Sequence, residues 1–198
     1  MHWIHRNGIR DHFYATWDLL DQKSLLNIGW QCLIKNPEIV SAIESNDQEK
    51  LRQLNIRNVL KNFAQMTSGD IVIVLPIREF DPRLFVVKIK SSRAISALHL
   101  SSKFQSGFVT QGLDDKFEKV NFNLDSGFYY GNDPNDFVDA GFFHEVEILA
   151  RFLRDSMSQE MQDLFRFQQT NLKIYDPQKQ QIIFDSLPKD VQSKIPRP

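Results

Sequence analysis

The chain contains one cysteine, Cys32, in 198 residues. A single cysteine excludes a disulfide within the chain and any zinc site built from several cysteines, and it suits a reducing cytosol. No apolar run approaches the roughly 18 residues that a membrane-spanning helix needs. The segment from Met1 to Phe13 also lacks the apolar core of a signal peptide. From these absences we expect a cytoplasmic protein without a membrane partner.

The chain also lacks the basic excess that is usual in proteins held to nucleic acid by phosphate contacts alone. Its formal net charge is −1 at pH 7. The charge is unevenly distributed, because residues 1–93 carry 13 Lys and Arg against 10 Asp and Glu, whereas residues 94–198 carry 11 against 15. The N-terminal half can therefore present a local basic face.

The composition is that of a folded protein, with 41% hydrophobic and 25% charged residues. A chain of this length forms one domain, or one domain with an elaboration. Most of the 16 Phe side chains are expected in the core, as is Trp17, which lies on the apolar face of a predicted amphipathic helix. No glycine-rich phosphate loop follows a predicted strand, which argues against a doubly wound parallel sheet.

Hydrophobic periodicity and turn residues predict strands and helices without regular alternation. The segment Gly69 to Leu75 has the continuous β-branched run of a central strand. Asn36-Pro37 is typical of a helix start, whereas Asp176-Pro177 is expected only to end the last strand. This arrangement predicts an α+β fold around a mixed, partly closed sheet. The predicted strands are 2–5, 25–30, 69–75, 84–90, 93–100, 144–151 and 171–175, and the predicted helices are 11–21, 37–45, 47–66 with 56–66 as its second part, 158–165 and 189–193.

A different composition marks the segment from about residue 101 to 141. It is rich in Gly, Asn and Asp, and between Leu113 and Asp139 it carries seven acids and two lysines. These residues indicate loops and short strands rather than helices. Its many Phe and Tyr residues make it too aromatic for a disordered linker. We therefore predict an ordered insertion that lies on the sheet.

Several motifs occur in an order that resembles a known family. Trp3 lies in the first predicted strand, and Ile28-Gly29-Trp30 ends the second. Ile56-Arg57-Asn58 begins a helical segment, and Gly69-Asp70-Ile71-Val72 opens the buried strand. This order is similar to the EVE and PUA-like domains, and the Ile-Gly-Trp ending is similar to the EVE-like N-terminal reader domains of Mrr-type restriction systems. Three C-terminal segments resemble the same domains: 144–149, 158–165 and 168–174.

The resemblance implies a PUA-like (EVE-type) partly closed β-barrel with flanking helices, over residues 1–175. The aromatic-rich insertion at about 101–141 interrupts this domain, and residues 176–198 form a C-terminal extension. The family implies a nucleic-acid-binding reader that holds a modified or flipped base, in DNA more than in RNA. Such a reader serves as the specificity component of a restriction or defence system. Because the chain has no room for a nuclease domain, a nuclease or NTPase is expected on a separate chain.

Base recognition needs an aromatic surface for stacking and polar groups for the base edge. The resemblance and the positions of the rings select two sets of side chains, although each also has an ordinary structural explanation in the core, in a cap or on a solvated surface. The predicted base-pocket residues are Trp30, Asp70, Trp3, Asn58, Tyr129 and Tyr130. The predicted phosphate-contacting residues are Arg57, Lys61, Arg78, Lys88, Lys90 and Arg93.

The sequence contains no recognisable catalytic constellation, so we expect a binding protein rather than an enzyme. A nuclease of the PD-(D/E)xK type needs an acid two residues before a strand lysine, and Lys88 has Val86 there. We also expect no metal and no cofactor, since His2 and His5 fall on opposite faces of a strand. Two alternatives remain open on the same fold: a sensor for a small molecule or nucleotide, and a protein–protein adaptor that uses exposed Phe side chains of the insertion.

Overall fold

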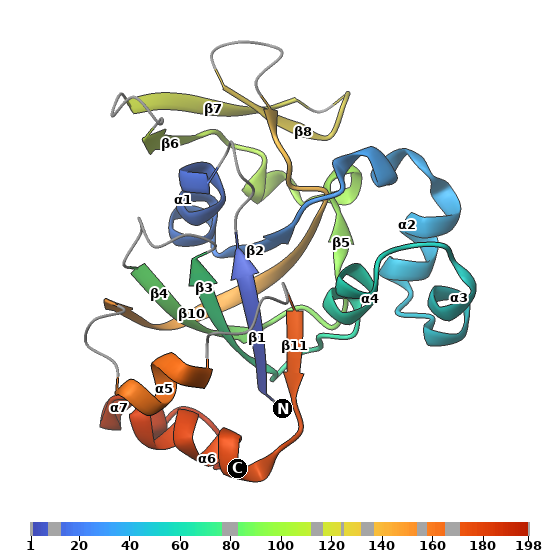
Figure 1. Ribbon diagram of the computed structural model, residues 1–198. Coiled ribbons are helices and arrows are strands. Elements are labelled where there is room, and N and C mark those ends of the chain that lie inside the picture. The colour runs from blue at the N-terminus through green and yellow to red at the C-terminus, as the bar shows by residue number, and fades with distance from the viewer. Residues whose placement is uncertain are drawn as a thin grey trace.

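The computed structural model describes residues 2–7, 13–76, 83–111, 117–123, 125–131, 137–153, 158–164 and 171–197 (Figure 1). The chain has a mixed α+β fold in which a strongly curled main sheet forms a half-barrel, accompanied by a small second sheet and an aromatic cluster. This confirms the predicted α+β class and the mixed, partly closed sheet.

The main sheet has the strand order β11-β1-β3-β4-β10-β2, and β5 also pairs with β10. Strands β1 and β3 are parallel, and the other pairs are antiparallel. The strands are β1 (His2–Asn7), β2 (Leu25–Ile28), β3 (Ile71–Pro76), β4 (Arg83–Ile89), β5 (Ile95–Ser96), β10 (Phe142–Leu153) and β11 (Asn171–Ile174). The small sheet has the order β6-β7-β8-β9, with β6 (Phe108–Gln111), β7 (Phe117–Asn123), β8 (Phe128–Tyr130) and β9 (Phe137–Val138).

Strand β10 curls the main sheet because it pairs with different strands along its length. Its first residues, 142–145, pair with β2, and its later residues, 146–153, pair with β4. The register shifts between Ile148 and Ala150, and such a bulge increases the local twist of a strand. The resulting half-barrel has helices on both faces (Figure 1).

Seven α-helices and three short 3-10 helices accompany the sheets in the described part of the chain. The α-helices are α1 (Phe13–Lys23), α2 (Pro37–Glu44), α3 (Gln48–Gln53), α4 (Asn58–Ala64), α5 (Gln159–Leu164), α6 (Pro177–Ser186) and α7 (Lys189–Gln192). The 3-10 helices are η1 (Gln31–Lys35), η2 (Ala97–His99) and η3 (Ser102–Phe104).

The central strand β3 separates two apolar cores. Val72 and Val74 face the larger core, and Ile71 and Ile73 face the smaller one, because successive side chains of a strand point to opposite faces. Both faces are buried, so the β-branched run predicted for a central strand is confirmed. Trp17 is fully buried in the larger core, as predicted.

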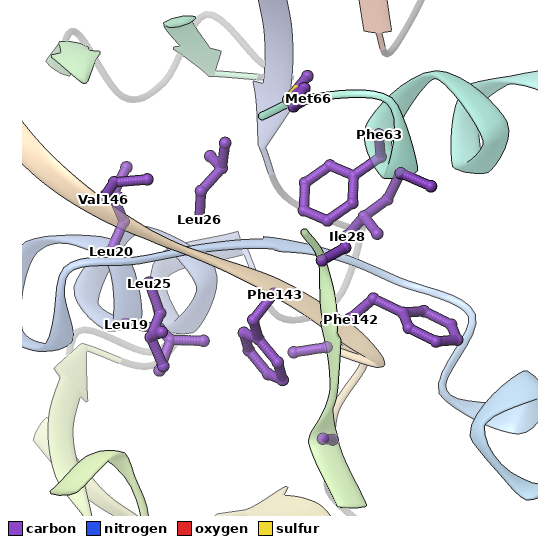
Figure 2. Packing of buried hydrophobic residues seen from close by; sticks show 14 of the residues in the cluster. Leu19, Leu20, Leu25, Leu26, Ile28, Phe63, Met66, Phe142, Phe143 and Val146 are labelled. Atoms are coloured by element: carbon purple, nitrogen blue, oxygen red, sulfur yellow. The ribbon is translucent and has the colours of Figure 1, made fainter. Parts of the chain in front are cut away.

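The larger core continues around β2 and β10 (Figure 2). Leu19, Leu25 and Phe143 lie on one side of β10, whereas Leu26 and Phe63 lie on the other. Leu19 comes from α1 and Phe63 from α4. Consequently, α1 and α4 are held against opposite sides of this part of the sheet.

The smaller core is closed by the C-terminal residues. Ile183, Phe184, Leu187, Val191 and Ile195 are all buried in it, and α5, α6 and α7 lie together at one end of the molecule (Figure 1). The segment predicted as an extension after residue 175 thus covers one face of the main sheet. Helix α6 was not among the predicted helices: Asp176-Pro177 was expected only to end the last strand, but α6 begins at Pro177.

Helix α6 begins with the same pattern, a capping side chain followed by proline, that correctly predicted the start of α2. The Asp176 carboxylate accepts the N–H of Gln178 at 2.9 Å, and Pro177 occupies the first helical position. The same arrangement starts α2, where Asn36 Oδ1 accepts the N–H groups of Glu38 and Ile39. Proline breaks a strand but is well suited to the first turn of a helix.

Three other predicted elements are shorter than expected or divided. The second strand stops at Ile28 rather than Trp30. The helix predicted over 47–66 is two helices, α3 and α4, because Leu54 and Arg57 adopt extended backbone between them. The strand predicted over 93–100 is reduced to β5, since the Ser96 hydroxyl accepts the N–H of Leu98 and starts the 3-10 turn of η2.

Candidate nucleic-acid interface

Trp3 and Asp70, both predicted for the base pocket, are in direct contact. Trp3 Nε1 donates to Asp70 Oδ2 at 3.0 Å, and the N–H of Thr67 donates to the same oxygen at 3.1 Å. Trp3 is 1% exposed and Asp70 is 7% exposed. The structure thus brings these two residues together inside the half-barrel and gives the carboxylate a role in the turn before β3.

Basic side chains of β11 and α4 lie on the same side of the fold as β1. The ammonium of Lys173 on β11 lies 5.1 Å from the ring centroid of Trp3, within the range of a cation–π interaction. Helix α4 contacts β11 and carries the predicted residues Asn58 and Lys61, after Arg57 at its N-cap. Arg57 and Asn58 are exposed, whereas Lys61 is half-buried and donates to the carbonyl of Arg52 at 3.3 Å.

Tyr129 lies at the centre of the aromatic cluster between the two sheets. Its ring centroid is 4.9 Å from that of Phe122, 5.5 Å from Phe108 and 6.4 Å from Phe143. The hydroxyl donates to the carbonyl of Phe104 at 2.7 Å, and burial raises the pKa of Tyr129. The cluster therefore fixes the aromatic-rich insertion on the main sheet. Tyr130 is half-buried, and its ring lies 5.9 Å from that of Phe128.

Trp30 occupies an unusual turn between β2 and η1. Its backbone is left-handed, with φ 62° and ψ 44°, a conformation that is an outlier for a bulky side chain. Its carbonyl accepts the N–H of Leu33 at 2.9 Å, and its half-buried side chain packs against the larger core. The residue predicted to end a strand is therefore the residue that reverses the chain into η1.

A groove of about 600 Å³ is lined in part by η1, the 3-10 helix that follows this turn. Ile34 and Lys35 of η1, residues of α2, Arg93 and the 3-10 helix η2 form its walls. Apolar contacts come from Ile34, Val40 and Leu98. Among the predicted base-pocket and phosphate-contacting residues that the structure describes, only Arg93 lines this groove.

Of the charged side chains that line the groove, Glu44 has partners within the fold, whereas Lys35 and Arg93 form no ion pair in the described residues. Glu44 accepts the backbone N–H of Ser96 at 2.9 Å and contacts His99 Nδ1 at 2.8 Å. Lys35 and Arg93 are exposed, and neither forms an ion pair with a carboxylate in the described part of the chain. The groove therefore presents two cations without an ion-pair partner, together with the Glu44 carboxylate and apolar walls.

Sequence reasoning did not select Lys35, Glu44 or His99, which come together only in the folded chain. Lys35 directly precedes the Asn36 cap, so its position at a helix start was the one local signal. Of the remaining predicted phosphate contacts, Lys88 is half-buried and Lys90 is exposed. Arg78 lies outside the described residues.

A pair of buried histidines flanks Phe63 in the larger core. The Phe63 ring centroid lies 4.8 Å from the ring of His144 and 5.6 Å from that of His5. His144 Nε2 lies 3.0 Å from the carbonyl of Phe63, so this nitrogen carries the proton and Nδ1 accepts from Ser91 Oγ at 2.8 Å. Burial lowers the pKa of His144 to about 4. The ring is therefore neutral at physiological pH.

In the described residues, no group of three or more His, Cys, Asp and Glu side chains is placed to hold a metal ion. None of the described helices is both long enough and apolar enough to cross a membrane. In comparisons with known proteins, the chain matches no family model, no curated protein and no solved structure.

Proposed function

We propose that this protein binds nucleic acid through the groove between η1, α2 and η2, as a reader without catalytic activity of its own. The observation that carries the proposal is the pair of cations, Lys35 and Arg93, that form no ion pair in the described residues and lie on a groove with apolar walls. Phosphate contacts from Lys and Arg provide most of the affinity of proteins for nucleic acids. The apolar side chains Ile34, Val40 and Leu98 suit the sugar and the face of a base.

We propose further that Trp30, which does not itself line the groove, takes part in recognition of a single base. Its turn leads directly into η1, which supplies Ile34 and Lys35 to the groove. Stacking on an aromatic ring contributes about 1–3 kcal/mol per base. We therefore retain Trp30 as the wall against which a modified or flipped base stacks. On this proposal the protein is the specificity component of a defence system, and cleavage belongs to a separate chain.

The test is binding of the purified protein at low salt to duplexes that contain plain cytosine, 5-methylcytosine or 5-hydroxymethylcytosine. We expect tighter binding to one modified duplex. Trp30→Ala should weaken binding to that duplex far more than binding to the plain duplex. Equal losses on both duplexes, or no binding by the unmodified protein, would contradict the proposal.

A matched pair of double variants isolates the groove. Lys35→Gln with Arg93→Gln removes two positive charges from the groove, and Lys189→Gln with Lys194→Gln removes two from the region of α7, at the other end of the molecule (Figure 1). The groove variant should lower the salt dependence of log K by about 2, because each phosphate contact contributes about 0.9. The α7 variant should leave it unchanged. The same result for both variants would show that only net charge matters.

The size of the groove favours a free nucleotide as the second candidate ligand. A volume of about 600 Å³ falls within the range of small-molecule sites. In that case the protein is a nucleotide sensor on the same fold. Binding of a free nucleotide, without duplex binding at low salt, would support the sensor and exclude the reader.

A further inference from the structure

Glu44 is the only carboxylate among the described residues that line the groove. Surfaces that bind phosphates are usually lined with cations, and a carboxylate opposes such binding by repulsion. Glu44 nevertheless lines the same groove as Lys35 and Arg93, and its side chain is 20% exposed. The groove therefore combines a part suited to an anionic group with a part suited to a group that donates hydrogen bonds.

The fold holds the Glu44 carboxylate in one position. Strand β5 lies beside α2 (Figure 1), and the backbone N–H of Ser96 on β5 donates to Glu44 Oε1 at 2.9 Å. His99 Nδ1 lies 2.8 Å from Oε1 and 2.9 Å from Oε2. These contacts come from two elements, β5 and η2, and restrict rotation of the side chain. A group that is already held in place binds a ligand with a smaller loss of conformational entropy.

The carboxylate keeps an acceptor for a ligand. An ionised carboxylate has about four lone-pair positions. The Ser96 N–H uses one position on Oε1, and the His99 Nδ1–H uses one more, or one on each oxygen if it is shared. In either case Oε2 retains a lone pair. Because a carboxylate only accepts hydrogen bonds, the ligand group that binds there must be a donor.

His99 adds a second acceptor beside Glu44. Its Nδ1 faces the carboxylate, so this nitrogen carries the proton. In the neutral ring, Nε2 is then an acceptor. The His99 side chain is 59% exposed and lines the groove, so a ligand in the groove can reach it. Together, Glu44 and His99 favour a ligand group that carries N–H donors.

We propose that Glu44 accepts the exocyclic amino group of a nucleobase whose phosphate binds Lys35 and Arg93. A glutamate carboxylate accepts readily from an amino group such as N4 of cytosine. A keto base such as uracil places a carbonyl oxygen at that position, and the carboxylate repels it. The inference rests on the proposed nucleic-acid function, to which it adds the group that selects the base.

The test compares cytidine 5′-monophosphate with uridine 5′-monophosphate, which differ only in whether the base carries an amino or a keto group. The unmodified protein should bind the cytidine nucleotide about ten- to a hundredfold more tightly in isothermal titration calorimetry, as expected for one hydrogen bond to a charged group. Because sugar and phosphate are identical, the contributions of Lys35 and Arg93 cancel. Equal affinities, or binding of neither nucleotide, would overturn the inference.

Glu44→Gln tests the residue itself. Glutamine keeps the length of the side chain and one oxygen for the Ser96 N–H, but replaces the other oxygen with an NH₂ group that donates. This variant should lose the preference for the cytidine nucleotide. Glu38→Gln is the matched control, because it removes the same charge from the exposed first turn of α2, and Glu38 does not line the groove. A preference that survives in Glu44→Gln, or that Glu38→Gln also loses, would refute the role of Glu44.

A measurement on the unmodified protein does not depend on how well a variant folds. In ¹⁵N-correlated NMR spectra, the backbone N–H of Ser96 reports on the Glu44 carboxylate to which it donates. The backbone N–H of Gln178, which donates to Asp176 Oδ1 at 2.9 Å in α6, is the control. The cytidine nucleotide should shift the Ser96 signal more than the uridine nucleotide does, and should leave the Gln178 signal in place. Equal responses of Ser96 to the two nucleotides would contradict the inference.

Duplex binding separates this inference from the proposed function. If the unmodified protein binds duplexes while Glu44→Gln keeps the preference for the cytidine nucleotide, the role of Glu44 is refuted and the reader stands. If the unmodified protein binds no duplex but prefers the cytidine nucleotide through Glu44, the reader is refuted. The role of Glu44 then stands as the selective contact of a nucleotide sensor.

Discussion

The indole N–H of Trp3 donates to Asp70 Oδ2 at 3.0 Å, which joins the first strand of the chain to the turn before β3. The two residues are 67 positions apart, and both were selected from the sequence as base-pocket residues. Their bond joins β1 to the residue before β3, at the end where the parallel pair begins. A hydrogen bond to a charged acceptor contributes about 1.5–3 kcal/mol to stability.

Trp3→Phe should therefore destabilise the protein more than Trp17→Phe. Both substitutions shorten a fully buried tryptophan, so the loss of packing is similar. Trp17 Nε1, however, has no hydrogen-bond partner among the described residues. We expect the free energy of unfolding to fall by about 1–3 kcal/mol more for Trp3→Phe, as measured by urea denaturation. Equal losses would show that the bond to Asp70 contributes nothing.

Position 30 should prefer glycine to alanine, because its backbone is left-handed. Glycine adopts positive φ without the steric cost that other residues incur. Trp30→Gly should unfold with a free energy about 1 kcal/mol higher than Trp30→Ala.

Ser41 is the control for this comparison, because it is exposed within α2. There alanine should be more stable than glycine by about 1 kcal/mol. The same order at both positions would contradict the left-handed turn.

Stability should fall between pH 6.5 and 4 because of His144. The pKa of this histidine is lowered from 6.5 to about 4 by burial, so the unfolded chain binds a proton that the folded protein excludes. The stabilisation is complete above pH 6.5 and is lost as the pH falls toward 4, by about 3 kcal/mol in total. Denaturation midpoints measured across this range provide the test.

His144→Gln should flatten this pH dependence, because glutamine keeps a donor and an acceptor and does not titrate in this range. His99→Gln is the control, since the His99 side chain is 59% exposed. If the slope is unchanged in His144→Gln, another group causes the loss of stability.

The C-terminal helices should be essential for the fold rather than an appendage. Phe184 is buried in the smaller core, whereas Tyr175 is 73% exposed at the end of β11. Phe184→Ala should cost about 3–5 kcal/mol, and Tyr175→Ala should change stability by less than about 0.5 kcal/mol. Thermal denaturation distinguishes the two, and a mild effect at Phe184 would show that the smaller core is dispensable.

The candidate site was only partly predictable. Trp3 and Asp70 were selected together and lie together, and Arg93 was selected and lines the groove. Lys35 was missed, because it is a lone lysine before a helix cap. The groove that Lys35 lines arises from contacts between segments distant in the sequence.

The sequence by itself determined the local elements, because periodicity and capping act within a few residues. The buried run of β3, the Asn36 cap of α2 and the apolar face around Trp17 follow from such patterns. Tertiary structure decided the rest: the curl that β10 imposes by pairing with two strands, the closure of the smaller core by α6, and the left-handed turn at Trp30. These features depend on long-range packing, in which the free energy of burying distant side chains together outweighs the local preferences of the backbone.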